Sequence, residues 1–239
     1  MAGKPLKDTA VIIPARMGAT RLPGKPLADI GGVPMVVRVA LGASRSGAGL
    51  VAVATDDERI ASVVRSAGIE AVMTGPADSG SARVYEAWGR LGRPGGRIVD
   101  LQGDEPFAGP EWIAALASVD TAPDRVVSLA RPCTAERAAC ESSVKVALRC
   151  DGSALYFSRS PIPHGSGSFL EHVGVYCFSP ESFDRCMQAH RCPLSAGERL
   201  EQLSWLCAGV EIAIVEGPFH GFGIDTPDDL ERARREILG

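Results

Sequence analysis

The first half of the chain alternates short apolar runs with stretches of helical spacing, and this alternation constrains the fold more than any other feature. Runs typical of buried strands lie at residues 10–13, 50–54, 69–73 and 97–101. Helical patterns follow them at residues 34–46, 57–67, 81–91 and 110–118. A helix between two strands returns the chain for parallel pairing, so we predict an α/β fold with a Rossmann-like, mostly parallel central sheet. Thr55, with Glu58 three residues later, predicts a capping box at the second helix.

The pattern changes after Val126. Four predicted strands follow without a long helix between them, at residues 126–130, 144–149, 154–157 and 172–178. Two helices, a strand and a final helix complete the chain, at residues 180–189, 196–207, 210–215 and from Pro227. The sequence shows no linker or repeat, so we predict a single domain over residues 1–239. Its smaller inserted β region, partly antiparallel, is expected within residues 126–195.

Charge and cysteine usage exclude several classes of protein. The net charge is −4, whereas nucleic-acid-binding proteins usually carry an excess of cations, so we expect no nucleic-acid partner. No apolar run approaches the ~20 residues that cross a bilayer, and the first one reads as a strand and not as a signal peptide, so we expect no membrane association. The seven cysteines are odd in number and form no C-x-x-C pair. They favour reduced thiols in a cytoplasmic protein over a disulfide framework or a zinc site.

Cations gather in the loop directly after the first strand, within the stretch VIIPARMGATRLPGKPL (11–27). Ligands of open α/β sheets bind at the carboxyl ends of strands, where this loop is expected. Arg16, Arg21 and Lys25 bring positive charge suited to phosphates, and the glycines and prolines form a tight backbone whose N–H groups can face an anion. The spacing matches neither the Walker P-loop nor G-x-G-x-x-G. A solvated basic turn is the alternative, but cations placed directly after a buried strand favour a phosphate site.

Two acidic stretches are placed where they can meet this loop. Asp104, in LQGDEP, follows the fourth predicted strand and is expected at the same sheet edge, although an acidic turn is the alternative. In GIDTPDDL, Thr226 as the N-cap and Asp229 three residues later explain a helix start, and Asp225 is left without a structural role. Since Mg²⁺ takes one or two carboxylates together with phosphate oxygens, we predict a Mg²⁺ site between the acids and the cationic loop.

Together these stretches resemble the CMP-KDO synthetase family, the 3-deoxy-manno-octulosonate cytidylyltransferases. The resemblance covers nearly the whole chain and rests, in this order, on IIPARMGATRLPGKPL, VAVATDDERI, MTGPADSGSARVYEA, LQGDEP, LYFSRSPIP, HVGVYCF, RLEQLSWL and GIDTPDDLERAR. It implies a nucleotidyltransferase fold and an enzyme that transfers CMP from CTP to an acidic acceptor with release of pyrophosphate. A non-catalytic nucleotide-binding module is the alternative. Such a module could lose Asp104 or Asp225, and both are present.

The resemblance also assigns roles to individual residues. It implies that CTP is bound by Pro14, Ala15, Arg16, Arg21, Lys25, Ser79, Gly80, Gln102 and Asp104. It implies that the acceptor is bound by Gln102, Arg159, His172, Tyr176, Glu201 and Gln202. Catalysis would rest on Arg16, Lys25, Asp104 and Asp225, with Mg²⁺ held by Asp104 and Asp225. The resemblance further implies a homodimer formed through the β region.

The stretches assigned to the acceptor depart from the family pattern. A short connection over residues 163–168 replaces a longer segment, Ser204 replaces an arginine, and the stretch that begins at Asp78 lacks a histidine. A shorter loop and fewer cations predict a smaller acidic acceptor, such as phosphonoformate in phosphonate or phosphinate antibiotic biosynthesis. The Arg-rich, Lys-poor composition of a GC-rich genome favours the same acceptor. KDO is the alternative, because loop lengths can change without a change of substrate. We expect Arg159, aided by His172, to pair with the anionic group.

Overall fold

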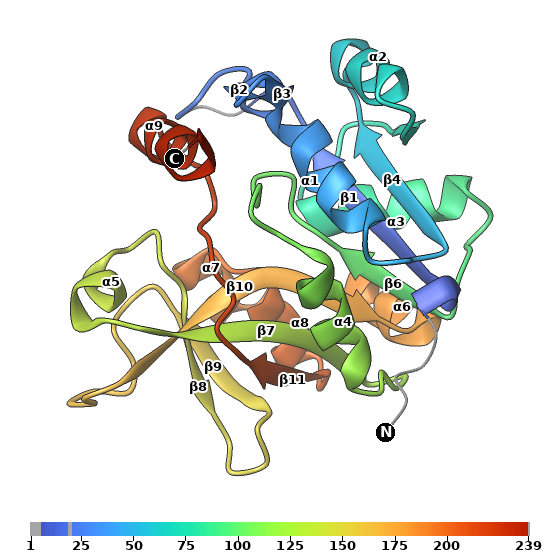
Figure 1. The fold of residues 1–239 in the computed structure, drawn as a ribbon. Coiled ribbons are helices and arrows are strands. Elements are labelled where there is room, and N and C mark those ends of the chain that lie inside the picture. Colours follow the sequence, from blue (N-terminus) through green and yellow to red (C-terminus); the bar gives the residue numbers. More distant parts are fainter. Residues whose placement is uncertain (1–5, 19–20, 239) are drawn as a thin grey trace. The chain divides into compact units, whose positions relative to one another are not determined.

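The computed structural model describes residues 6–18 and 21–238 (Figure 1). The chain divides into two compact units. The first unit takes the described residues before Ala115 and those from His220 onward, and the second unit is Ala115–Phe219. The β region predicted within residues 126–195 falls in the second unit, and the single domain over residues 1–239 stays a prediction.

The first unit is built on four parallel strands, β1 (Thr9–Ala15), β4 (Leu50–Thr55), β5 (Glu70–Met73) and β6 (Arg97–Asp100). Their order is β6-β1-β4-β5. Val11 of β1 pairs with Val51 on one side and Val99 on the other. Every residue of β1 is buried, which explains why the strand reads as a continuous apolar run. The predicted parallel sheet of an α/β fold is confirmed.

Five helices belong wholly or partly to the first unit: α1 (Met35–Ser44), α2 (Glu58–Ser66), α3 (Gly80–Arg90), α4 (Pro110–Ser118) and α9 (Pro227–Leu238). Helix α1 packs on β1 and β4, and α3 packs on β1, β4 and β6. Right-handed crossovers put α1 and α3 on opposite faces of the strands, as Figure 1 shows. A small hairpin, β2 (Asp29–Ile30) with β3 (Val33–Pro34), and two 3₁₀ turns, η1 (Leu6–Asp8) and η2 (Lys25–Leu27), were not predicted.

The two predicted helix starts have different outcomes. At α9 the Asp229 N–H donates to Thr226 Oγ1 (3.2 Å) and Asp229 Oδ2 accepts from the Thr226 N–H (2.9 Å), so the predicted cap is confirmed. At α2 the prediction was wrong. The cap is Asp57, which accepts from the Arg59 N–H (2.9 Å), because Thr55 is still the last residue of β4.

An apolar cluster ties the C-terminal segment to the hairpin region of the first unit. Buried side chains of Ile30 and Met35 pack with Phe222, Ile224 and Leu230. The segment that precedes α9 is therefore fixed beside the loop that follows β1, although the two lie at opposite ends of the sequence. This contact places Asp225 near the cationic loop.

The second unit is a mixed, largely antiparallel sheet of β7 (Arg125–Cys133), β8 (Lys145–Leu148), β9 (Ala154–Ser158), β10 (Phe169–Phe178) and β11 (Glu211–Glu216). Strand β7 pairs with β11 in parallel and with β10 antiparallel. Strand β8 pairs antiparallel with both β10 and β9. The smaller antiparallel β region predicted from the sequence is confirmed.

The helices that lie wholly in the second unit are α5 (Ala135–Ala139), α6 (Pro180–Gln188), α7 (Pro193–Glu198) and α8 (Gln202–Cys207). We predicted one helix over residues 196–207, and this was wrong. Arg199 has φ 55° and ψ 48°, and the Leu200 N–H donates to the Ser195 carbonyl (3.2 Å), so the first helix ends there. In the described part of the chain, no helix has the length and apolar character needed to cross a membrane.

Candidate active site

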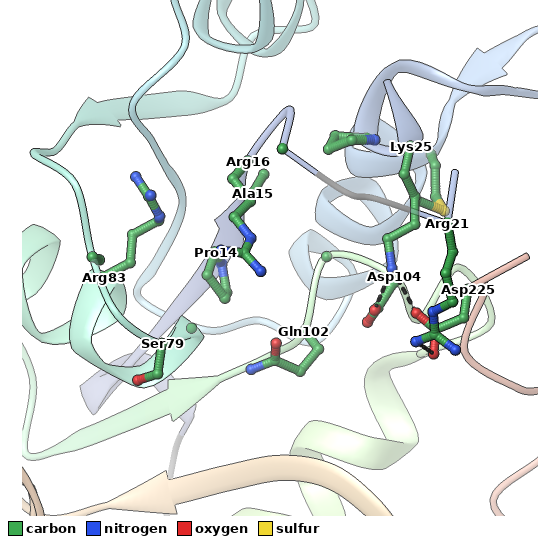
Figure 2. A pocket seen from close by; sticks show the side chains of 16 residues that line it. Pro14, Ala15, Arg16, Arg21, Lys25, Ser79, Arg83, Gln102, Asp104 and Asp225 are labelled. Atoms are coloured by element: carbon green, nitrogen blue, oxygen red, sulfur yellow. Dashed lines mark hydrogen bonds and ion pairs between the residues drawn. The ribbon is translucent and has the colours of Figure 1, made fainter. Parts of the chain in front are cut away.

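A cavity of about 330 Å³ opens in the first unit (Figure 2). Every residue assigned to CTP by the resemblance lines it: Pro14, Ala15, Arg16, Arg21, Lys25, Ser79, Gly80, Gln102 and Asp104. Asp225, from the other end of the chain, lines it as well. Four cationic side chains and two carboxylates face the cavity, so the lining is net positive and suits a polyanion.

The cavity lies at the carboxyl ends of two neighbouring strands. Pro14 and Ala15 are the last residues of β1, and Gln102, Gly103 and Asp104 lie in the loop that follows β6. Strands β1 and β6 pair in parallel, so their carboxyl ends reach the same edge of the sheet. This is the edge at which open α/β sheets bind ligands.

Lys25 is the centre of the charged side of the cavity. Its Nζ donates to Asp104 Oδ2 (2.7 Å), to Asp225 Oδ1 (3.1 Å) and to the Ile224 carbonyl (2.9 Å). Gly24, with φ 73°, turns the backbone immediately before it, which glycine does without the strain of a side chain. One ammonium thus holds two carboxylates that come from different parts of the sequence.

The two carboxylates outweigh the cost of burying this ammonium. Burial by itself lowers the pKa of Lys25, but the attraction of Asp104 and Asp225 and their hydrogen bonds raise the pKa above its ordinary value. Lys25 is therefore charged at neutral pH.

Two arginines complete the cationic side. Arg21 Nη2 lies 3.0 Å from Asp225 Oδ2, and the side chain of Arg21 is 59% exposed. Arg16 is exposed, and among the described residues its guanidinium has no ion-pair partner. Figure 2 shows Lys25 and Arg21 beside Asp104 and Asp225, on the opposite side of the cavity from Arg83. Arg16 is thus left available for an anionic ligand.

Asp104 and Asp225 offer oxygen donors of the kind that Mg²⁺ prefers. Within residues 6–18 and 21–238 no group of three or more His, Cys, Asp or Glu side chains gathers as a metal site. Two carboxylates are nevertheless sufficient for an ion that takes its remaining ligands from phosphates and water. The donor set therefore fits a magnesium–nucleotide complex, and Lys25 lies between the two acids.

The side of the cavity formed by Ser79, Gly80 and Gln102 is held by local hydrogen bonds. Ser79 caps α3 by accepting from the Ala82 N–H (3.1 Å). Gln102 Nε2 donates to Asp100 Oδ1 (2.7 Å). A Cβ on Gly80 would come within 3.0 Å of Gln102 Oε1, so glycine lets the start of α3 approach this side chain. These contacts hold Gln102 in place.

Gly103 lets two loops meet at the cavity floor. A Cβ at this position would lie 2.7 Å from the Pro14 carbonyl oxygen, which belongs to the backbone and cannot swing away. The loop that carries Asp104 can therefore run against the end of β1 only because residue 103 is glycine.

Arg83 lines the cavity, and we had assigned it no role. Its side chain is buried, Nη1 donates to Thr74 Oγ1 (2.6 Å), and Nη2 pairs with Asp56 Oδ2 (2.7 Å). The signal that could have identified it is the S-G-x-x-R spacing, which sets Arg83 one helical turn after the Ser79 cap. Met35 and Ala77, also missed, carry no comparable signal.

Of the residues assigned to the acceptor, only Gln102 belongs to the first unit. The others belong to the second unit: Arg159, His172, Tyr176, Glu201 and Gln202. Arg159 follows β9 directly, and its Nε donates to the Glu198 carbonyl (3.0 Å) and its Nη1 to the Glu141 carbonyl (2.9 Å). Glu198, which sequence reasoning missed, also accepts from the Arg159 N–H (2.8 Å).

His172 was expected to aid Arg159 in pairing with the anionic group of the acceptor. Burial lowers the pKa of His172 to about 3, so the imidazole is neutral at physiological pH. Its Nε2 lies 2.8 Å from Ser128 Oγ, and its ring packs against Phe157 and Tyr176. A neutral imidazole can exchange a hydrogen bond with an acceptor, but it adds no charge.

The remaining assigned residues lie on the elements around the aromatic core of the second unit. Tyr176 on β10 packs edge-on against Trp205 of α8, with ring centroids 4.9 Å apart. Gln202 is buried at the first turn of α8, and Glu201 precedes it. The break at Arg199 thus makes Gln202 the first residue of a new helix. Their role toward an acceptor stays a prediction.

Comparison with known proteins gives consistent matches along the chain. Residues 10–212 match the cytidylyltransferase family. The chain is 48% identical over 235 residues to a 3-deoxy-manno-octulosonate cytidylyltransferase of Anaeromyxobacter dehalogenans (strain 2CP-C), which covers 96% of this chain and 97% of that protein. It is 45% identical over 237 residues to the protein of that name from Azorhizobium caulinodans, with 95% and 94% covered.

Solved structures agree with these sequence matches. A CMP:2-keto-3-deoxy-manno-octonic acid synthetase complexed with CTP matches with a TM-score of 0.89 and 36% identity, over 96% of this chain and 98% of that one. A cytidylyltransferase from Leptospira borgpetersenii matches with a TM-score of 0.64 over 97% of this chain and 87% of that one. At 17% identity, this second likeness concerns the fold alone.

Proposed function

The chain belongs to the cytidylyltransferase family, and from this premise we propose that it is a CMP-KDO synthetase, which transfers CMP from CTP to 3-deoxy-manno-octulosonate. One observation carries the proposal. The residues assigned to CTP, which are scattered over the chain, line a single net-positive cavity at the carboxyl edge of the sheet. The relatives named above supply the acceptor, since both are KDO cytidylyltransferases.

This acceptor replaces the one we expected first. The short connection at residues 163–168 predicted phosphonoformate, but the named relatives favour the alternative, KDO, across at least 95% of the chain. The connection is largely exposed, and exposed loops vary in length without disturbing the elements that they join. A short loop was therefore a weak guide to the substrate. A phosphonate or antibiotic pathway has no support from these similarities.

In the proposed reaction, an acceptor oxygen attacks the α-phosphorus of CTP and pyrophosphate leaves. Arg16, Arg21 and Lys25 hold the triphosphate and stabilise the charge that collects on the leaving group, which is the main contribution of protein side chains to such transfers. Asp104 and Asp225 would hold Mg²⁺, which would neutralise phosphate charge when bound. On binding, phosphate oxygens take over part of the coordination of Lys25 and Arg21, which otherwise hold the two aspartates.

We assign the cytosine base of CTP and the acceptor to different residues. We assign the cytosine to Ser79 and Gly80, which line the cavity at the start of α3. Arg159 uses Nε and one Nη1 proton for carbonyls, which leaves Nη2 and the other Nη1 proton for the acceptor carboxylate. His172 contributes a hydrogen bond as a neutral imidazole.

The test is pyrophosphate release measured over a matrix of nucleotides and acceptors. CTP with KDO should give the highest kcat/KM, and ATP, GTP and UTP should be poor donors. A kcat/KM for phosphonoformate above that for KDO would refute the acceptor, and absence of release with every pair would refute the activity.

A pair of arginine variants tests the acceptor site separately. Arg159→Lys should raise the KM for KDO far more than the KM for CTP, because lysine keeps the charge and loses the planar fork. Arg149→Lys is the matched control, since Arg149 also donates from Nη1 to a backbone carbonyl, that of Ala154 (2.7 Å), and has no assigned ligand. Equal effects of the two variants on the KM for KDO would remove Arg159 from the site.

A further inference from the structure

Two cysteines lie together at the ends of the α7–α8 segment in the second unit. Cys192 precedes α7, and Cys207 is the last residue of α8. Their Sγ atoms are 2.7 Å apart, although fourteen residues separate them along the chain. A disulfide bond has an S–S distance of about 2.05 Å, so bond formation requires the sulfurs to approach by less than about 1 Å.

Hydrogen bonds hold Cys192 in this arrangement. The Cys192 N–H donates to Ser195 Oγ (3.0 Å), and Ser195 Oγ donates to the Cys192 carbonyl (2.9 Å). Cys192 Sγ also lies 3.7 Å from the Leu203 carbonyl of α8. The pair is therefore set by the packing of α7 against α8, and the two thiols do not meet by chance at a chain end.

Both thiols of the pair are accessible to solvent, and Cys192 is the more acidic of the two, since its own pKa is lowered and that of Cys207 is raised. Cys207 is exposed and Cys192 is partly exposed, whereas Cys177 and Cys186 are buried. The hydrogen bond from Cys207, with that of the Ser195 N–H, lowers the pKa of Cys192 to about 7, and burial raises the pKa of Cys186. A thiol near pKa 7 is substantially ionised at neutral pH, and the thiolate is the nucleophile in disulfide exchange.

We propose that Cys192 and Cys207 are a redox site that forms a reversible intramolecular disulfide. The oxidant is a low-molecular-weight disulfide, RSSR. The Cys192 thiolate attacks one sulfur of RSSR, forms a mixed disulfide and releases RS⁻. The Cys207 thiolate then attacks Cys192 Sγ and releases the second RS⁻. The two RS⁻ take up the two protons that the protein thiols lost and become two RSH. Two protein thiols are thus oxidised while one RSSR is reduced.

The bond would close a loop that contains residues assigned to the acceptor. Glu198, whose carboxylate and carbonyl hold Arg159, lies inside the loop, as do Glu201 and Gln202. Because the thiols already stand close together, the disulfide locks the arrangement seen here. This link to the acceptor rests on the proposed function, whereas the redox site itself does not.

The sequence offers a direct readout of the bond. Trypsin cleaves after Arg191, Arg199 and Arg232, which places Cys192 in peptide 192–199 and Cys207 in peptide 200–232, with no other cysteine in either. Reduced full-length protein is equilibrated in glutathione buffers of increasing oxidised fraction, blocked with N-ethylmaleimide and digested. We expect the two peptides to appear linked, lighter by two hydrogen atoms than their sum, and to separate again with dithiothreitol.

Two cysteine variants test whether oxidation is specific to this pair. Cys207→Ser should abolish the linked peptide and leave glutathione on Cys192, while Cys150→Ser, at an exposed cysteine far from the pair in sequence, should preserve the linkage. Oxidised wild type should melt several degrees above reduced wild type, since the bond restricts the unfolded chain, and Cys207→Ser should show no such rise.

The proposal is overturned if both thiols carry glutathione without linking, if the linkage joins two chains on a non-reducing gel, or if oxidation lowers the melting temperature. None of these readouts requires a substrate. Their failure is therefore distinguishable from failure of the proposed activity.

Discussion

Asp225→Asn separates the role of this carboxylate in folding from its role in catalysis. The substitution keeps the size of the side chain and its capacity to accept hydrogen bonds, but it removes the negative charge. In the structure, Asp225 lies 3.1 Å from Lys25 Nζ and 3.0 Å from Arg21 Nη2, and its side chain is 40% exposed. The helix that follows is capped by Thr226 and Asp229, so it does not need Asp225.

The expected loss of stability is small. Exposed ion pairs contribute about 0.2–1 kcal/mol each, and asparagine retains part of the hydrogen bonding, so the total is about 1 kcal/mol. For a chain of this length that corresponds to about 2–4 °C in melting temperature. Loss of a charge directed at the reacting groups raises the activation free energy by roughly 3–4 kcal/mol, which lowers turnover about 10²–10³-fold. The catalytic effect should therefore exceed the structural one several-fold in free energy.

The assay is pyrophosphate release from CTP and KDO over a range of Mg²⁺ concentrations, with calorimetric titration of Mg²⁺ into the CTP complex as an independent readout. Asp225→Asn should lower turnover and weaken Mg²⁺ binding. Asp228→Asn is the matched control, because Asp228 is exposed at the same helix start and does not line the cavity described above. Unimpaired turnover and Mg²⁺ affinity in Asp225→Asn would refute the assignment of Asp225 as a metal ligand, and equal losses in both variants would point to the helix start instead.

Three more predictions concern the glycine at the cavity floor, the buried histidine and the assembly. Gly103→Ala should lower both melting temperature and affinity for CTP, because the new Cβ meets the Pro14 carbonyl at 2.7 Å; unchanged CTP binding by calorimetry would contradict this. His172 has its pKa lowered to about 3 by burial, so between pH 6.5 and 3 the unfolded state binds more protons than the folded state. The free energy of unfolding of wild type should thus fall by roughly 1 kcal/mol per pH unit below about pH 6 relative to His172→Gln, and parallel pH profiles by urea denaturation would be the opposing result. The protein should be a homodimer by light scattering at micromolar concentration, and a mass of one chain would count against the predicted β-region interface.

Local patterns in the sequence determined the elements that frame the cavity. The apolar run over residues 10–13 predicted the buried parallel strand β1. The spacing of apolar residues over 110–118 predicted helix α4 with the bounds that the structure shows. Once a strand–helix alternation implies a parallel sheet, the residues that follow each strand must lie at its carboxyl edge. Arg16 and Asp104 could therefore be placed at one site from the sequence alone, and both line the same cavity.

Some predictions were wrong because the patterns do not report the interactions that decide them. Asp57 caps α2 because β4 extends through Thr55, and the pairing of a strand end cannot be read from a capping pattern. The spacing of apolar residues over 196–207 suited one helix, but Arg199 adopts a left-handed conformation and divides it. The choice between KDO and phosphonoformate also lay beyond the sequence pattern, since an exposed loop of altered length leaves the packed elements unchanged.

Tertiary structure alone decided which distant groups meet. Lys25 bonds to Asp104, 79 residues away, and to Asp225, 200 residues away, because the packing of Ile224 and Phe222 against Ile30 and Met35 returns the end of the chain to the first loop. The same holds for Cys192 and Cys207, which carry no sequence signal of pairing and meet where α7 packs on α8. The spacing of apolar residues shows which face of a helix or strand is buried. Which element packs against that face depends on contacts between elements that are far apart in the chain.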